Sequence, residues 1–229
     1  MLPYICEFLG TMMLILLGDG VVANVTLNKS GMKGAGSIQI TLAWGLAVML
    51  PAFIFGRGSG ASFNPALTIA LAVDGSFAWS LVPGYIIAQM AGAFVGACLV
   101  YALFKDQFDA TEDPGTKLGV FSPGPSIPNT FRNILSEAVG TFVLVFSIKG
   151  LAQVSGSDEG VGKLLVFGII VACGMSLGGL TGYAINPVTL APALRTLCCP
   201  SRGRARATSS MVWSCPSLGP SLVPWSPSF

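Results

Sequence analysis

The sequence contains no histidine and few charged residues: 12 Lys and Arg and 10 Asp and Glu among 229 residues. An ordinary soluble domain carries about 25% charged residues, so a charged fraction of 10% excludes that class. The lack of histidine, with no two cysteines close together before residue 198, argues against a zinc site or a serine-type triad. A net charge of +2 does not support a nucleic-acid partner. We therefore expect a non-enzymatic protein with no catalytic residues, metal or cofactor.

What the sequence does contain is long apolar runs. Hydrophobic residues make up 52% of the chain, and the mean hydropathy is +0.73. A run of about 20 apolar residues can cross the hydrocarbon core of a bilayer. The five runs of this kind, each predicted to be a transmembrane helix, are residues 4–27, 37–55, 79–104, 133–154 and 161–180. The fold class is therefore an all-α membrane protein with the lipid bilayer as a partner.

Three other segments need separate interpretation. Residues 105–132 hold four acidic residues and four prolines, which predicts an aqueous loop. The stretches 59–73 and 181–194 are apolar but too short to cross, and each contains Asn-Pro, so we expect re-entrant half-helices. Asp19, within the first apolar run, is expected at the membrane interface and receives no function.

The two halves of the chain repeat one another. Glu7-Phe8-Leu9-Gly10-Thr11 returns as Glu137-Ala138-Val139-Gly140-Thr141, and the Asn64-Pro65 segment returns as Asn186-Pro187. Three predicted spans separate the copies, so the second copy is inverted in the membrane. Inverted repeats with broken helices indicate a transport site near the bilayer midplane.

The Asn-Pro pairs suggest how such a site would work. Proline is suited to the first helical turn, so Pro65, Ala66 and Pro187 are expected to start the half-helices, with Asn64 and Asn186 as caps. Two helix N-termini that meet at the midplane carry partial positive charge and repel cations. The asparagine amides would donate to the oxygen of water or of a neutral hydroxyl compound.

Glu7 and Glu137 are costly inside membrane helices, at about 2.5–3.5 kcal/mol each at the helix centre. A buried carboxylate can accept hydrogen bonds from the backbone N–H groups of a non-helical loop. We therefore expect these two residues to hold the re-entrant segments in place. Glycine-rich faces, with Gly92 and Gly96 in the third run and Gly168, Gly174, Gly178 and Gly179 in the fifth, are interpreted as close helix packing.

With the paired Asn-Pro motifs and the Glu-x-x-Gly-Thr openings, the chain resembles the major intrinsic protein family of aquaporins and aquaglyceroporins, and in particular bacterial glycerol facilitators. The resemblance implies an inverted-repeat bundle of six tilted helices and two half-helices, with a pore in each protomer of a homotetramer. It also implies a bacterial plasma membrane protein that passes glycerol and water.

The resemblance also implies a constriction that selects the permeant. Trp44, Gly174 and Tyr183 match the tryptophan, the small residue and the aromatic residue of the facilitators, and together with Asn64 and Asn186 they are the predicted substrate-binding residues. Water-only members narrow this constriction with histidine, which the chain lacks. A wide, apolar corner would suit the carbon backbone of a polyol.

After Pro187 the sequence departs from the family. Thr189 stands where the family has arginine, Leu190 where the facilitators have aspartate, and no sixth apolar run follows. Residues 188–193 can be encoded by the codons GTG-ACC-TTG-GCC-CCC-GCG. If the reading frame starts one base earlier, with C in front, the same bases encode Arg-Asp-Leu-Gly-Pro-Arg, the facilitator continuation. We therefore expect a channel domain over 1–187, with half-helix segments at 59–73 and 181–187, and a disordered, frame-changed tail rich in Pro, Ser and Arg over 188–229.

The predicted function is a passive channel for glycerol, small neutral solutes and water. Three alternatives stay open: a water-selective aquaporin, a secondary transporter, or an inactive truncated product of a facilitator gene. Coupled transporters bury ionisable residues for the driving ion, and the predicted spans hold few beyond Glu7, Asp19 and Glu137.

Overall fold

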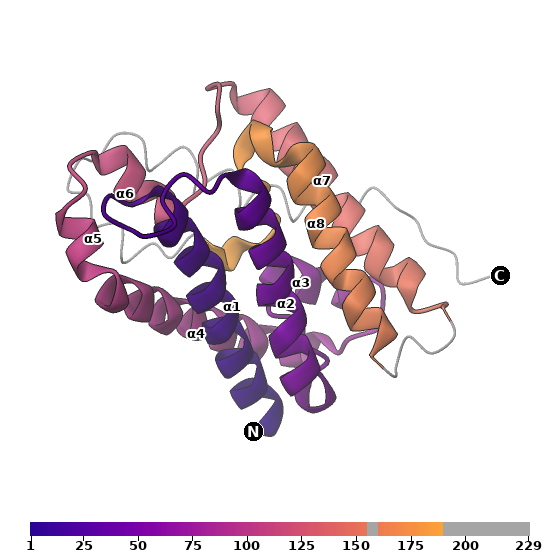
Figure 1. Ribbon diagram of the computed structural model, residues 1–229. Helices are drawn as coiled ribbons and strands as arrows, with labels where there is room; N and C mark the ends of the chain where they lie inside the picture. The colour runs from indigo at the N-terminus through magenta and orange to yellow at the C-terminus, as the bar shows by residue number, and fades with distance from the viewer. Residues whose placement is uncertain (155–159, 190–229) are drawn as a thin grey trace.

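The structure, a computed structural model, describes residues 1–154 and 160–189. Within these ranges every regular element is helical (Figure 1). The elements are α1 (Leu2–Thr26), α2 (Ser37–Ser59), α3 (Pro65–Val73), η1 (Trp79–Leu81), α4 (Val82–Leu103), α5 (Lys105–Asp109), α6 (Pro114–Phe121), α7 (Thr130–Leu151), α8 (Val161–Thr181) and η3 (Pro187–Thr189). The predicted tail lies outside the described residues, apart from Val188 and Thr189.

Five helices are long and apolar enough to cross a membrane, and they confirm the five predicted spans. They are α1, α2, η1 with α4, α7 and α8. The ends differ by a few residues because local geometry, rather than hydropathy, stops each helix. Gly60 ends α2 and Gly182 ends α8, each in the left-handed region with φ of 84° and 83°, where a side chain would be strained.

The helices pack as two groups that follow the repeat. In the first group α1 packs against α2 and α4, and in the second α7 packs against α8 (Figure 1). The groups meet where α2 packs against α8 and where α3 lies against α7 and η3. The short helix α3 therefore lies at the junction of the two halves.

Glycine permits the closest of these contacts. A Cβ on Gly92 would lie 2.2 Å from the backbone oxygen of Phe8, and one on Gly96 would lie 2.5 Å from that of Met12. Backbone cannot yield as a side chain can, so α1 and α4 approach this closely only with glycine at both positions. On α8 no described residue packs closely on Gly168 or Gly179, since an added Cβ at either position would meet none of them within 4 Å.

The segment 105–132 is not a span, but much of it is not an aqueous loop either. Asp113 caps α6 by accepting from the N–H groups of Gly115 and Thr116, which starts a helix at Pro114. The stacked rings of Phe108 and Phe121, 5.5 Å apart, are buried in the main apolar cluster. Burial of these two rings and of Val120 fixes the segment against α1.

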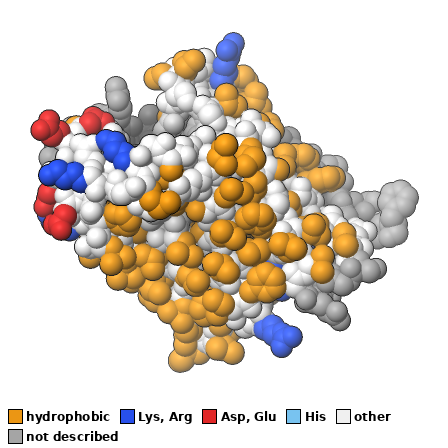
Figure 2. Space-filling model, viewed as in Figure 1, with side chains coloured by type: hydrophobic (Ala, Val, Ile, Leu, Met, Phe, Trp, Pro, Cys, Tyr) orange, Lys and Arg blue, Asp and Glu red, His pale blue; other side chains and the backbone are white. Residues whose placement is uncertain are grey.

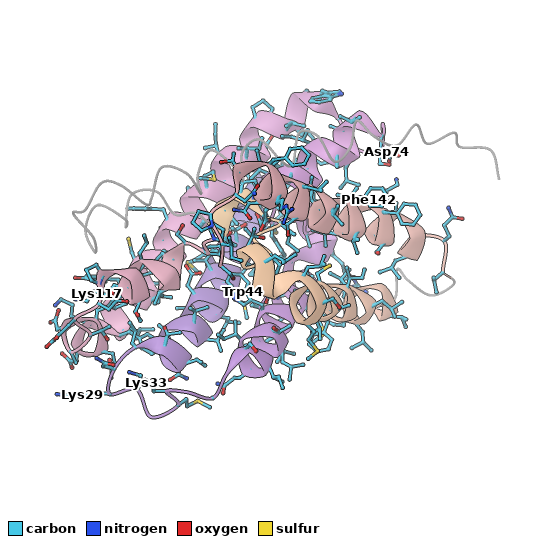
Figure 3. All side chains as sticks on the ribbon, turned by 90° about the horizontal axis from the view of Figure 1, so that it is seen from above. Lys29, Lys33, Trp44, Asp74, Lys117 and Phe142 are labelled. Atoms are coloured by element: carbon cyan, nitrogen blue, oxygen red, sulfur yellow. The ribbon has the colours of Figure 1, made fainter. Side chains whose placement is uncertain are left out.

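The outer surface is apolar around the helices and charged at the ends. Figure 2 shows hydrophobic side chains across the middle of the face, with acidic and basic side chains grouped beyond them. Viewed from above, Lys29, Lys33 and Lys117 gather at one edge, whereas Trp44 lies near the centre (Figure 3). This distribution fits a body with lipid around its middle and water at its ends.

Candidate functional site

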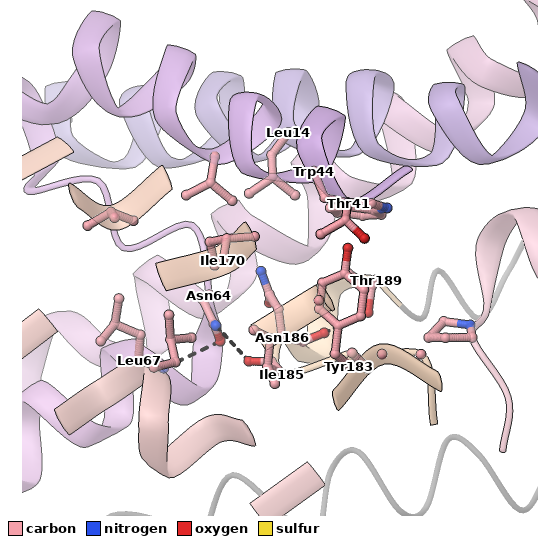
Figure 4. Close-up of a pocket in the computed structure, with 18 of the residues that line it drawn as sticks. Leu14, Thr41, Trp44, Asn64, Leu67, Ile170, Tyr183, Ile185, Asn186 and Thr189 are labelled. Atoms are coloured by element: carbon pink, nitrogen blue, oxygen red, sulfur yellow. Dashed lines mark hydrogen bonds between the residues drawn. The ribbon is translucent and has the colours of Figure 1, made fainter. Parts of the chain in front are cut away.

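The two Asn-Pro segments meet in the interior. The Asn64 side-chain amide donates to the carbonyl oxygen of Ile185 at 2.9 Å (Figure 4). In return, the Asn186 amide donates to the carbonyl oxygen of Phe63 at 2.9 Å. These reciprocal bonds relate the two segments by an approximate two-fold axis. Both asparagines are buried, at 5% and 8% exposure, and both line one cavity.

Each asparagine also caps the turn that follows it. Asn64 Oδ1 accepts from the N–H groups of Ala66 at 2.8 Å and Leu67 at 3.3 Å, and Pro65 occupies the first helical position of α3. Asn186 Oδ1 accepts from Val188 N–H at 3.2 Å, where Pro187 begins η3. Because the side-chain oxygens face the helix starts, the –NH₂ groups are left on the side of the partner segment.

The loops before the asparagines share an unusual backbone. Ala61 and Phe63 have φ of 55° and 46°, and the repeat-related Tyr183 and Ile185 have φ of 40° and 36°. Positive φ in non-glycine residues costs about 1–3 kcal/mol each and persists only where surrounding contacts enforce it. The same strain at four repeat-related positions indicates a geometry that both halves need.

Glu7 and its neighbours hold the first loop. The Glu7 carboxylate is fully buried and accepts from Ser62 N–H at 3.1 Å, Phe63 N–H at 2.8 Å and the Ser59 hydroxyl at 2.6 Å. A fourth bond comes from the Gln89 amide at 2.8 Å. Gln89 also donates to the Thr68 hydroxyl at 2.9 Å and so ties α4 to α3.

Glu137 makes the equivalent contacts in the second half. Its carboxylate accepts from Ala184 N–H at 3.2 Å, Ile185 N–H at 3.0 Å and the Thr181 hydroxyl at 2.5 Å. In each half, then, a buried carboxylate accepts from two successive backbone N–H groups just before the asparagine. These bonds compensate the desolvation of the charge.

One large cavity of about 910 Å³ passes this junction, bounded by α1, α2, α3, α8 and both loops. Trp44, Gly174 and Tyr183 all line it, together with Asn64 and Asn186. A Cβ on Gly174 would lie 2.5 Å from Thr41 Cγ2 and 2.8 Å from Tyr183 Cζ. Thr41 and Tyr183 point toward one another beside Trp44 (Figure 4), so glycine at position 174 leaves the space that these side chains occupy.

Thr41 and Asp19 are two of the lining residues that the sequence does not identify as part of the site. Thr41 belongs to no motif, and only its position one helical turn before Trp44 indicates it. Asp19, which receives no function from the sequence, is 2% exposed and lines the cavity. Hydropathy locates an acidic residue within a span but does not show which way its side chain points.

Other kinds of site find no support in the part of the chain that the structure describes. No group of three or more His, Cys, Asp or Glu residues there could hold a metal ion. The three cysteines of these ranges, Cys6, Cys98 and Cys173, are free thiols.

Comparison with known proteins gives consistent results. The profile of the major intrinsic protein family matches residues 2–202. The probable glycerol uptake facilitator protein of Thermotoga maritima is 48% identical over 218 residues, covering 95% of this chain and 92% of the relative. The glycerol uptake facilitator protein of Bacillus subtilis is 48% identical over 217 residues, covering 94% of this chain and 78% of the relative.

A solved structure also matches. The X-ray structure of the aquaglyceroporin from Plasmodium falciparum superimposes with a TM-score of 0.79 at 30% identity, covering 95% of this chain and 89% of that one. The similarity spans both halves of the repeat and the junction where the asparagines meet. This chain is a multi-pass membrane protein of the major intrinsic protein family.

Proposed function

We propose that the fold forms a passive channel for glycerol and other small neutral solutes, with water as a second permeant. The observation that carries the proposal is the reciprocal asparagine pair in the cavity wall. Each –NH₂ group has two N–H donors, and one of them bonds a carbonyl of the opposite loop. The second N–H donor of each asparagine is available to a permeating oxygen.

Cation exclusion follows from the same arrangement. The N-terminus of α3 and the first turn of η3 direct partial positive charge toward the junction. A cation there would lose its hydration shell and meet this positive charge, whereas a neutral hydroxyl group would accept hydrogen bonds. The site therefore favours neutral, oxygen-bearing solutes over ions.

The choice of glycerol rests on the wall around Trp44 and on the relatives. Trp44 and Tyr183 present aromatic surface to the cavity, and Gly174 leaves the space in which the Tyr183 ring and Thr41 pack. A polyol has both an apolar backbone and hydroxyl groups, so it matches a wall that is apolar on one side and donates hydrogen bonds on the other. The two bacterial relatives carry glycerol uptake in their names.

The alternative of a secondary transporter has less support. Glu7 and Glu137 each accept three or more hydrogen bonds from the protein, so neither carboxylate is free to bind a driving ion. Among the acidic residues of the described spans, this leaves Asp19 alone for that role. A water-selective channel would need a narrower constriction than one with glycine at position 174. Both alternatives predict transport behaviour that differs from a glycerol channel.

Stopped-flow light scattering of proteoliposomes in a glycerol gradient tests the proposal. A glycerol channel gives flux that rises linearly with the gradient and shows no stimulation by glycerol on the opposite side. Saturation with trans-stimulation would establish a carrier. Water flux without glycerol flux would establish a water-selective pore.

We also propose a homotetramer in the membrane, as the family resemblance implies. Large apolar side chains are exposed along the outer faces of the helices, among them Leu46 and Phe53 on α2 and Phe142 and Phe146 on α7. Faces of this kind suit either lipid or a second copy of the chain. Native mass spectrometry from detergent distinguishes a tetramer from a monomer.

A further inference from the structure

A second polar position lies in the cavity wall beside Trp44. Asp19, on α1, is 2% exposed and lines the cavity, and its Oδ2 has no hydrogen-bond partner among residues 1–154 and 160–189. The neighbouring Gly18 packs on the Trp44 ring, since a Cβ there would lie 2.5 Å from the indole. Asp19 is therefore at the level of the aromatic corner, away from the asparagine pair.

Within the described ranges, no neighbouring group neutralises a charge on Asp19. The other ionisable residues of these ranges that line the cavity are Lys163 and Tyr183. Lys163 packs against Gly56, with its Cε 3.0 Å from the position of a Cβ there, and Gly56 is about 18 Å along α2 from Trp44. An unpaired carboxylate at such a buried place is strongly disfavoured relative to the uncharged carboxylic acid.

Tyr183 lines the opposite wall of the same cavity, with its hydroxyl facing Thr41 (Figure 4). Buried polar atoms are nearly always hydrogen-bonded, to protein or to another molecule. The unpartnered carboxyl oxygen of Asp19, beside Trp44 on this cavity, therefore indicates an occupant that hydrogen-bonds to it.

We propose that Asp19 is a substrate-binding and specificity-determining residue, which as a carboxylic acid donates a hydrogen bond to a hydroxyl of a small neutral polyol seated against Trp44. Trp44 covers its carbon backbone. The inference deepens the proposed function and rests on it for the class of permeant.

Infrared difference spectroscopy of the 229-residue protein in membranes, with glycerol minus buffer, tests the contact directly. A protonated carboxylic acid has a carbonyl stretch separate from that of a carboxylate, and a new hydrogen bond shifts it. We expect glycerol to shift such a band, the band to vanish in Asp19→Asn, and the shift to persist in Asp106→Asn, which changes an exposed aspartate of α5. No shift, or a shift that survives in Asp19→Asn, would overturn the inference.

Flux measurements on the version of the protein read in the facilitator frame after residue 187 supply the second arm. Asp19→Asn keeps a donor and an acceptor and is expected to retain the ratio of glycerol to water permeability, whereas Asp19→Val is expected to lower it about fivefold, the value of one ordinary hydrogen bond. An unchanged ratio in a folded Asp19→Val protein would contradict the inference. If the unmodified protein shows the infrared shift but no glycerol flux, conduction fails while the contact stands. Glycerol flux without the infrared shift would support conduction and overturn the contact with Asp19.

Discussion

At the scale of single residues, two pairs of side chains determine the junction: Asn64 with Asn186, and Glu7 with Glu137. Their positions could be predicted because each residue occurs twice in an inverted repeat, and the structure brings the asparagines of both halves together. Gln89 and Asp19 could not be predicted in this way. Neither has a counterpart in the other half of the described chain, and hydropathy does not reveal the direction of a side chain.

The central asparagines lead to a prediction about ions. Asn64→Asp keeps the oxygen that caps α3 but replaces the donor to Ile185 by a second acceptor and adds a negative charge. The charge offsets the partial positive charge of the helix ends, so we expect measurable cation conductance in planar bilayers. Asn129→Asp is the matched control, since Asn129 caps α7 in the same way but does not line the cavity. Equal ion conductance in both variants would contradict the midplane role of Asn64.

The buried carboxylates lead to a prediction about stability. Glu7→Gln places an –NH₂ group against donors from Ser62, Phe63 or Gln89. A buried donor left without an acceptor costs about 1–3 kcal/mol, so the free energy of unfolding falls by that amount. Thermal unfolding in detergent measures the loss.

The control for that substitution is Glu112→Gln, which alters an exposed residue and is expected to leave the melting temperature unchanged. Glu137→Gln is expected to destabilise less than Glu7→Gln, because Glu137 accepts three of these hydrogen bonds and Glu7 accepts four. A larger loss for Glu137 would contradict the assignment of these carboxylates as loop holders.

At the scale of elements, the five spans were predictable because hydropathy over about 20 residues is a strong signal. The segment 105–132 was not, because Pro and Asp mark turns and helix starts alike. Asp113-Pro114 is a cap followed by a first-turn proline, and it starts α6. Only the burial of Phe108 and Phe121 shows that the segment packs on the bundle.

Helix packing gives a prediction at this scale. Gly92→Ala puts a methyl group 2.2 Å from the Phe8 backbone oxygen, and α1 and α4 must separate to accommodate it. Overpacking of this kind costs about 1–3 kcal/mol, which thermal unfolding would detect. Gly168→Ala on α8 meets no described residue within 4 Å, and we expect it to be neutral or stabilising because alanine is favoured over glycine in a helix by about 1 kcal/mol. Similar losses in both variants would refute close packing at Gly92.

The two halves are also linked by charge at the end of α3. Lys149 of α7 forms an ion pair with Asp74 and donates to the Ser76 hydroxyl at 2.8 Å. Partial burial raises the pKa of the Asp74 carboxyl, but the hydrogen bonds from Lys149 and Ser76 and the Lys149 charge outweigh it, so the pKa lies below its ordinary 3.8. The stabilisation is therefore complete above pH 3.8 and is lost as the pH falls through the lower folded-state pKa.

Asp74→Asn tests this linkage. The variant should melt below the unmodified protein at pH 6, and the difference should disappear in acid once Asp74 is protonated in both folded and unfolded states. A difference in melting temperature that is constant from pH 6 down to pH 3 would show that the ion pair is not its source.

At the scale of the whole molecule, the inverted repeat explains why the two Asn-Pro segments meet: each half inserts one broken segment, and the junction of α2 with α8 brings them together.

The frame change predicted at residue 188 stays a proposal, since the residues beyond Thr189 lie outside the described ranges. Resequencing the gene across codon 188 decides it. We expect the version read in the facilitator frame to pass glycerol, and the 229-residue chain to insert in the membrane without forming a competent pore.

Glycerol flux into proteoliposomes tests most directly whether the asparagine junction and the aromatic wall of Trp44 and Tyr183 form a passive polyol channel. Stopped-flow light scattering would compare the facilitator-frame protein, the 229-residue chain and empty liposomes. We expect glycerol flux that is linear in the gradient for the facilitator-frame protein, without ion leakage. Water flux with no glycerol flux, or glycerol flux that saturates and is trans-stimulated, would contradict it.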